Sequence, residues 1–200
     1  TSAVLQIRTA QPDVPTVHAL KTADLSAMVT GLALKQTDPG VYIALEDGDV
    51  ITLASAEPIQ EKVGERIFTL DAGGFWQVHR HAAATLTSAV QNAIDAQLFD
   101  PRAANLDLYG GVGLLAAAVG DRFGGATRIT SVESDEQATE YASENLVDWM
   151  GARAQTARVD RYLQQVLRES SASERSRFES ATVVLDPPRA GAGKAVVASL

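Results

Sequence analysis

A regular alternation of short apolar runs with longer amphipathic stretches is the feature that most limits what this chain can fold into. Residues 83–98 carry Leu86, Val90, Ile94 and Leu98 at four-residue spacing, which predicts an amphipathic helix. Strand and helix patterns then alternate through the second part of the sequence. Strands that are joined through helices of this kind run parallel in one sheet. We therefore expect an open α/β domain with a parallel sheet.

The expected elements of this domain can be placed on the sequence. Its strands are expected at residues 105–109, 128–133, 154–160 and 181–186. Its later helices are expected at residues 114–123, at residues 135–150 and from Tyr162 onward.

The first part of the chain has a different pattern, in which short apolar runs are broken by turn residues. Asp47 and Gly48 separate two runs of β-forming residues at 41–45 and 50–53, a strong signal for an antiparallel hairpin. Further strands are expected at residues 4–7, 29–34 and 67–70. We therefore divide the chain into a small antiparallel β-rich segment at residues 1–71 and the α/β domain at residues 72–200.

Composition excludes several classes of protein. The net charge of -8, with 25 acidic and 17 basic residues, argues against coating of nucleic acid by bulk electrostatics, although a local basic patch stays possible. The chain has no cysteine, so it can form no disulfide, thiolate metal site or cysteine nucleophile. No apolar run approaches the roughly 18 residues that span a bilayer. We expect a cytoplasmic protein that binds neither metal nor membrane.

A glycine turn follows the first strand of the predicted parallel sheet and opens a helix, with the sequence Asp-Leu-Tyr-Gly-Gly-Val-Gly at residues 107–113. Glycines let a ligand approach the backbone closely, and a helix N-terminus offers free N–H groups. Glu133 ends the next strand about 20 residues later, the spacing of a carboxylate that accepts hydrogen bonds from a ribose. The pattern fits a dinucleotide site and the S-adenosylmethionine site of class I methyltransferases equally well, and a turn without a ligand is a third interpretation.

Two further motifs favour a methyltransferase. Asp-Pro-Pro-Arg at residues 186–189 ends the last strand, and its prolines fix a rigid loop at the edge where α/β sheets bind ligands. Such a stiff loop suits an enzyme that clamps a planar base beside a methyl donor. Gly-Gly-Phe-Trp-Gln-Val-His at residues 73–79 precedes the first long helix.

The order of these motifs, with Glu133 and Asp160 between them, resembles the RNA uracil-5-methyltransferase family, which makes 5-methyluridine in transfer RNA or 23S ribosomal RNA. The resemblance covers residues 75–191, and the β-rich region loosely resembles the family's central domain. It implies a class I methyltransferase (Rossmann-like) open parallel sheet, truncated in its C-terminal half. It also implies S-adenosylmethionine as cofactor and RNA as partner.

The resemblance assigns roles to individual residues. Gln77 matches a glutamine near donor and target, Tyr109 an aromatic residue beside the methionine part of the donor, and Glu133 the acid that binds the donor ribose. Asp160 matches a polar residue near the adenine, and Asp186 an aspartate near both donor and target base.

The remaining assignments are less direct. Gly111 and Gly113 are expected to bring their backbone to the donor, and Arg189 to contact RNA together with Gln77 and Asp186. The chain departs from the family at Gly110, where a cysteine is common, at Leu114, where an asparagine is frequent, and at His79, where an asparagine is usual.

The family's chemistry needs a cysteine that adds to C6 of uracil, so that C5 attacks the methyl group, and a general base that then removes the C5 proton. Both groups are expected beyond Leu200. We therefore expect an enzyme fragment that binds the donor and is inactive alone. Its last strand is expected to expose an apolar edge that favours self-association. A methyltransferase that acts on a base amine or ring nitrogen, and a non-catalytic nucleotide- or NAD-binding domain, are the alternatives.

Overall fold

The computed structural model describes residues 7–8, 41–44, 50–54, 58–71, 73–77 and 79–200. The chain divides into two compact units, residues 1–61 with 70–76 and residues 62–69 with 77–200. The strand expected at residues 29–34 and most of the one expected at 4–7 lie outside the described residues. The domain boundary expected after Asp71 stays a prediction.

A small sheet of three strands occupies the first unit. It contains β1 (Ile7–Arg8), β2 (Val41–Ala44) and β3 (Val50–Ala54) in the order β1-β2-β3. Strands β2 and β3 are antiparallel, with Ala44 opposite Val50, as the hairpin prediction requires. Strand β1 is parallel to β2, so this sheet adds one parallel pair to the antiparallel pair that was expected.

A second pair of strands, β4 (Ile59–Val63) and β5 (Arg66–Leu70), forms a two-stranded sheet. The sequence predicts β5 but not β4. Only Ile59 and Val63, at the two ends of β4, are buried. The three residues between them are polar, so the sequence lacks the alternation of apolar and polar residues that marks a strand. Gly64 lies in the turn between the strands with a φ of 61°, a conformation that favours glycine.

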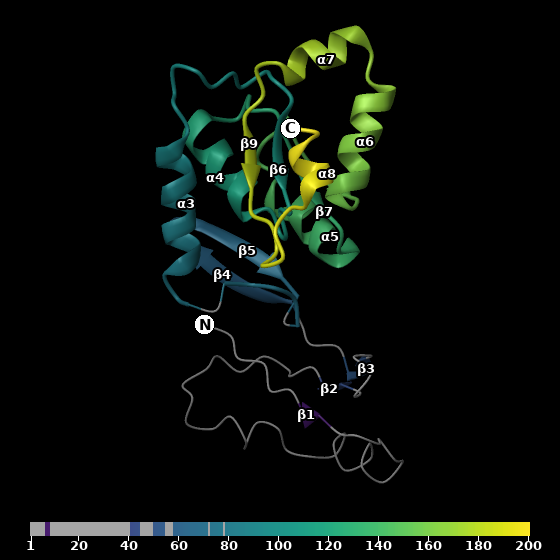
Figure 1. The fold of residues 1–200 in the computed structure, drawn as a ribbon. Helices are drawn as coiled ribbons and strands as arrows, with labels where there is room; N and C mark the ends of the chain where they lie inside the picture. The colour runs from purple at the N-terminus through teal and green to yellow at the C-terminus, as the bar shows by residue number, and fades with distance from the viewer. Residues whose placement is uncertain (1–6, 9–40, 45–49, 55–57, 72, 78) are drawn as a thin grey trace. The chain divides into compact units, whose positions relative to one another are not determined.

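The expected parallel sheet is confirmed in the second unit. It contains β6 (Asn105–Leu108), β7 (Ile129–Glu133), β8 (Ala152–Thr156) and β9 (Val183–Leu185) in the order β8-β7-β6-β9, with every pair parallel (Figure 1). Leu108 lies opposite both Val132 and Leu185. The carboxyl ends of β6, β7 and β9 therefore meet at one edge of the sheet.

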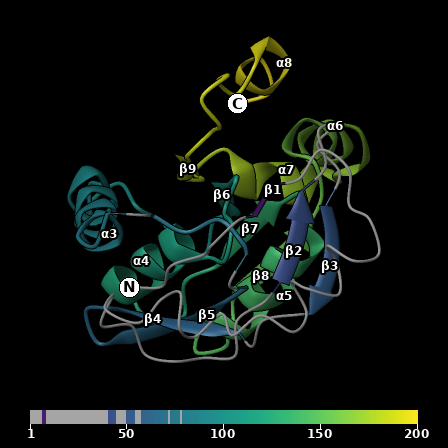
Figure 2. The same ribbon diagram turned by 90° about the horizontal axis from the view of Figure 1, so that it is seen from below.

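Helices cover both faces of this sheet. They are α3 (Ala82–Ala93), α4 (Leu114–Phe123), α5 (Glu136–Asn145), α6 (Val159–Glu169), α7 (Ala172–Phe178) and α8 (Lys194–Val197). Figure 2 shows α4 and α5 on one face and α6 and α7 on the other. Side chains of β6 alternate accordingly: Leu106 and Leu108 pack against Val159 and Leu163 of α6, whereas Asp107 bonds to α4.

Several predicted boundaries are wrong. Helix α3 ends at Ala93 instead of Leu98, because the chain turns at Asp95, whose carbonyl accepts hydrogen bonds from the N–H groups of Leu98 and Phe99. Helix α5 ends at Asn145 instead of Met150. Strand β8 ends at Thr156, four residues before the predicted end at residue 160.

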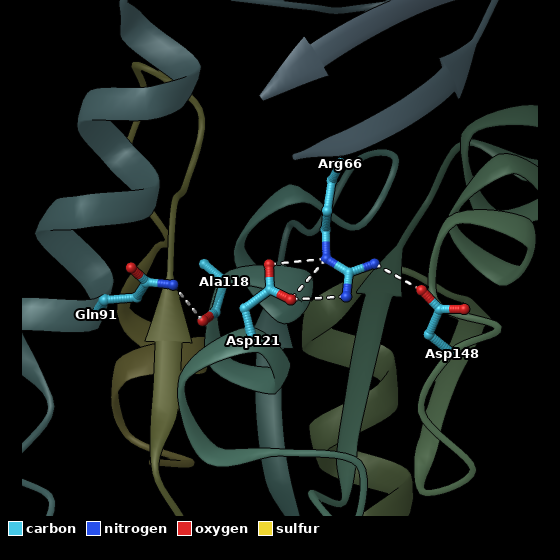
Figure 3. A network of polar contacts seen from close by, with 5 residues as sticks. All are labelled: Arg66, Gln91, Ala118, Asp121 and Asp148. Carbon is cyan, nitrogen blue, oxygen red and sulfur yellow. Dashed lines mark hydrogen bonds and ion pairs between the residues drawn. The ribbon is translucent and has the colours of Figure 1, made fainter. Parts of the chain in front are cut away.

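Arg66 attaches the start of β5 to the body of the second unit (Figure 3). Its Nε lies 2.7 Å from both carboxylate oxygens of Asp121, at the end of α4, and its Nη1 lies 2.9 Å from Asp148. The guanidinium also lies over the ring of Trp149, 3.8 Å from the centroid. A charged group that is both paired and stacked holds a single position, so Arg66 orders this end of the strand.

Strand β9 lies at one edge of the sheet that the described residues form, and its residues Val183 and Leu185 are 37% and 38% exposed. Self-association through this edge stays a prediction. In the part of the chain that the structure describes, no helix has the length and apolar character needed to cross a membrane.

Gly120, in α4, is expected to resist substitution. A Cβ at Gly120 would lie 2.5 Å from Nε1 of Trp149, so the indole ring would have to move. Alanine usually stabilises a helix relative to glycine by about 1 kcal/mol, but overpacking of a core costs about 1–3 kcal/mol. We expect Gly120→Ala to lower the free energy of unfolding, measured by urea denaturation. Gly125→Ala, where a Cβ meets nothing within 4 Å, is the control and is expected to be nearly neutral.

Candidate functional site

The glycine turn between β6 and α4 has a backbone that few sequences can adopt. Tyr109, Gly111 and Gly113 have φ angles of 64°, 53° and 88°. The N–H groups of Tyr109 and Gly110 donate to the carbonyl of Val132, at 2.9 and 3.1 Å, and the N–H of Gly113 donates to the carbonyl of Gly110 at 2.9 Å. The turn is therefore closed on itself and held against β7.

Gly110 approaches its neighbours too closely for any side chain. A Cβ there would lie 2.8 Å from Oδ2 of Asp107 and would collide with Oγ of Ser131. This contact gives a physical reason for the glycine at position 110, where the resemblance described above leads us to expect cysteine. The hydroxyl of Ser131 occupies the space that a side chain at position 110 would need.

Asp107 is fully buried beneath this turn. Its Oδ2 accepts hydrogen bonds of 3.1 Å from the N–H of Ala116 and from the hydroxyl of Ser131. Its Oδ1 has no hydrogen-bond partner among the described residues. The pKa of Asp107 is raised to about 7. Burial is the largest cause, the charges of Asp186 and Glu133 act in the same direction, and the two hydrogen bonds oppose them.

The carboxylate of Glu133 lies at the same edge of the sheet. Its Oε2 accepts a hydrogen bond of 3.1 Å from the N–H of Gly111. Its Oε1 accepts from the hydroxyl of Ser134 at 3.0 Å and from the N–H of Asp135 at 2.9 Å. These bonds hold the carboxylate beside the glycine turn, and the contact of Glu133 with a donor ribose stays a prediction.

A cavity of about 420 Å³ adjoins the turn. Its lining includes Tyr109, Ser134, Arg158, Asp160 and the loop at residues 192–196. The hydroxyl of Tyr109 donates to the carbonyl of Ala192 at 3.3 Å. The cavity thus lies beyond the carboxyl ends of β6, β7 and β8, where open α/β sheets bind ligands.

Asp160 lines this cavity from a different element than the sequence suggests. It lies in the first turn of α6 and not at the end of a strand. The strand expected at residues 154–160 is wrong at both ends, because β8 spans Ala152–Thr156 and α6 begins at Val159. Its carboxylate accepts hydrogen bonds from Nε and Nη2 of Arg158, at 3.1 and 3.0 Å. The hydrogen bond from Arg158 lowers the pKa of Asp160.

The structure brings together five of the predicted site residues at one edge of the sheet and adds a sixth through the cavity. They are Tyr109, Gly111, Gly113, Glu133 and Asp186, with Asp160 in the cavity.

Two of the predicted residues are less closely tied to this edge. Gln77 is half-buried before α3, and among the described residues it has no hydrogen bond to the turn, Glu133 or Asp186. Arg189 is exposed in the loop after β9.

Sequence reasoning did not single out Asp107, Ser134 or Asn145 as site residues. Asp107 carried a usable signal, because a carboxylate in the middle of an apolar strand is buried and needs partners. Ser134 and Asn145 carried no such signal, because exposed and half-buried polar residues after a strand or in a helix are common. The contacts of Asn145 appear only in the structure, where its side chain bonds to Thr69 and Val112.

The raised pKa of Asp107 gives a test by pH. The folded protein keeps a proton on Asp107 that the unfolded chain releases near pH 4, so the free energy of unfolding should fall as pH rises from about 4 to about 7. We expect Asp107→Asn to remove this part of the pH dependence, measured by urea denaturation at a series of pH values. Wild-type and variant curves that run parallel across this range would contradict the prediction.

Comparison with known proteins identifies relatives of this chain and a solved structure with a similar fold. No protein-family model matches the chain. An RNA methyltransferase of Streptomyces avermitilis is 36% identical over 155 residues, which are 78% of this chain and 33% of that protein. One from Bifidobacterium longum is 35% identical over 158 residues, 76% of this chain and 34% of that protein. The chain thus spans about a third of the length of these relatives.

A solved structure agrees with the fold. The crystal structure of Pyrococcus abyssi tRNA (uracil-54, C5)-methyltransferase, in complex with S-adenosyl-L-homocysteine, superposes with a TM-score of 0.55 at 22% identity. The match covers 80% of this chain and 37% of that one. The parallel sheet and its flanking helices therefore have the fold of a class I methyltransferase, and over the third of their length that it spans this chain is similar in sequence to RNA methyltransferases.

Proposed function

We propose that this chain is the donor-binding part of an enzyme that transfers a methyl group from S-adenosylmethionine to C5 of a uridine in tRNA or 23S rRNA. The observation that carries the proposal is the hydrogen bond of 3.1 Å between the N–H of Gly111 and the carboxylate of Glu133. It joins the glycine turn to an acid at the end of the neighbouring strand, beside a cavity of about 420 Å³.

The residues of the site fit the three parts of S-adenosylmethionine. The carboxylate of Glu133 suits a ribose diol, which donates hydrogen bonds. Asp160 offers a polar group in the cavity for the adenine, and Tyr109 offers an aromatic ring there for the methionine part of the donor. The carboxylate of Asp186, exposed at the same edge of the sheet, favours the cationic amino-acid part of the donor. Once bound, the donor supplies a methyl group on a positively charged sulfur.

Transfer to RNA is supported by the relatives, which are named RNA methyltransferases. Uridine C5 as the target is supported by the fold-level likeness to the archaeal tRNA enzyme and by the Asp-Pro-Pro-Arg loop at residues 186–189. That loop follows β9 at the same edge, because the N–H of Asp186 donates to the carbonyl of Leu108 at 3.3 Å. Asp186 is exposed there and is free to face a base.

The chemistry at C5 sets a limit on what these residues can do alone. C5 of uracil becomes nucleophilic when a thiolate adds to C6, and this chain contains no cysteine. We therefore propose that the chain provides the donor site and that the thiol belongs to residues outside these 200.

Donor binding can be tested at Glu133. Glu133→Gln removes a charged acceptor of hydrogen bonds and should weaken binding of S-adenosylhomocysteine by about 10- to 100-fold, from the roughly 1–3 kcal/mol that such a group contributes. Titration calorimetry measures the dissociation constant. Glu140→Gln, an exposed residue of α5, is the matched control and should bind like the wild type.

The same titration separates the competing ligands. Binding of NAD but not of S-adenosylhomocysteine would overturn the proposal in favour of a dinucleotide-binding domain. Binding of neither would show that the turn has no nucleoside ligand.

The missing thiol can be tested by activity. We expect the chain, incubated with labelled S-adenosylmethionine and unmodified tRNA or 23S rRNA transcripts, to form no 5-methyluridine, measured by nucleoside chromatography. Formation of 5-methyluridine would show that the reaction needs no cysteine. Formation of another methylated nucleoside would favour an enzyme that acts on a base amine or ring nitrogen.

A further inference from the structure

The side chain of Asn145, the last residue of α5, makes three hydrogen bonds to main chain from two distant segments. Its Oδ1 accepts from the N–H of Thr69 at 2.9 Å, and its Nδ2 donates to the carbonyl of Thr69 at 3.0 Å. The same Nδ2 donates to the carbonyl of Val112 at 3.0 Å. An amide has two N–H donors and one carbonyl acceptor, so all the hydrogen-bonding groups of this side chain have partners.

One of these bonds reaches the glycine turn. Val112 lies between Gly111, which donates to Glu133, and Gly113, which opens α4. Because a peptide unit is planar, a hydrogen bond to the carbonyl of Val112 also fixes the direction of the N–H of Gly113. That N–H closes the turn by donating to the carbonyl of Gly110 at 2.9 Å.

The neighbours of Asn145 on α5 support the same stretch of backbone. A Cβ placed on Gly113 would lie 3.2 Å from Cγ of Leu146 and 3.5 Å from Cβ of Ala142, so these side chains already pack against the turn. Gly113 is buried, and its φ of 88° is one that residues with a side chain rarely adopt. The end of α5 therefore packs against the turn through two side chains and bonds to it through a third.

The two bonds to Thr69 are a separate function of the same side chain. They attach β5 to α5, but β5 is already attached through Arg66, which bonds to Asp121 and Asp148. Loss of the Asn145 side chain would therefore leave the β4–β5 strand pair attached through Arg66, whereas the carbonyl of Val112 would lose its hydrogen-bond donor.

We propose that Asn145 is a positioning residue of the donor site: it fixes the peptide unit between Val112 and Gly113, so that the turn presents the N–H of Gly111 to Glu133. The inference rests on the proposed function of the turn as the donor site. Asn145 itself touches no donor atom in this scheme. It acts through the backbone.

The experiment compares two variants that loosen β5 in different ways. Asn145→Ala removes the hydrogen bonds to Thr69 and Val112. Arg66→Gln removes the ion pairs of β5 with Asp121 and Asp148 and leaves the glycine turn unchanged. Amide hydrogen exchange of the peptide covering residues 109–115 and calorimetry with S-adenosylhomocysteine are measured on the whole chain. Asn145→Asp, which has nearly the same shape but cannot donate to either carbonyl when ionised, is a second variant in case the alanine variant does not fold.

We expect Asn145→Ala and Asn145→Asp to speed exchange in residues 109–115 and to raise the dissociation constant of S-adenosylhomocysteine, each about tenfold, the effect of one lost hydrogen bond. Arg66→Gln should speed exchange in strands β4 and β5 and leave the dissociation constant of S-adenosylhomocysteine within about twofold of the wild-type value. Unchanged exchange in residues 109–115 of both Asn145 variants would overturn the inference.

Equal weakening of binding in Arg66→Gln and the Asn145 variants would also overturn it, because a general loss of stability would then explain the effect. If the wild type does not bind S-adenosylhomocysteine, the proposed function fails. Hydrogen exchange alone then decides whether Asn145 fixes the turn.

Discussion

A carboxylate buried beneath the glycine turn is the constraint on which the arrangement of the site depends. Asp107 lies in the central part of the sheet, without contact with solvent, and its oxygen Oδ2 bonds to the first turns of α4 and to β7. An unpaired charge in such a place would be very unfavourable, so the backbone around it must supply donors. Gly110 lets the chain pass close enough over this carboxylate, and Ser131 completes the contact from the next strand.

Two asparagine side chains also bond to main-chain groups of separate segments, one at each end of the parallel strands. Asn105, fully buried where β6 begins, donates to the carbonyls of Asp100 and Arg128 and accepts from the N–H of Thr182 at 2.8 Å. It thereby joins the connections that lead into three neighbouring strands. Asn145 joins β5 to the glycine turn, which follows the carboxyl end of β6. In both places an amide satisfies main-chain groups that have no partner within a helix or sheet.

The sequence was sufficient to predict the parallel sheet, because the short β-forming segments at β6, β7 and β9 are separated by patterns of helical period. It was not sufficient for β4, whose two buried residues are separated by polar ones, or for the boundaries of α3 and α5, which depend on local hydrogen bonds. The glycine turn and Glu133 could be predicted together because their spacing is a local property of one βαβ unit.

The partners of Asp107 and Asn145 could not be predicted in the same way. They come from segments far apart in the chain, and only the folded sheet brings them together.

The conformation of Tyr109 has a consequence for how this turn can vary. A φ of 64° at a residue with a large side chain is less stable than the same backbone at glycine, on the order of 1 kcal/mol. The next two positions are glycines, so the chain uses the unstrained residue where nothing but backbone is required. The ring of Tyr109 packs against the apolar cluster that contains Leu108, and its hydroxyl donates to the carbonyl of Ala192 at 3.3 Å, so these contacts offset the strained backbone. A more relaxed loop with a glycine at position 109 would therefore lose the link between the glycine turn and the segment that follows β9.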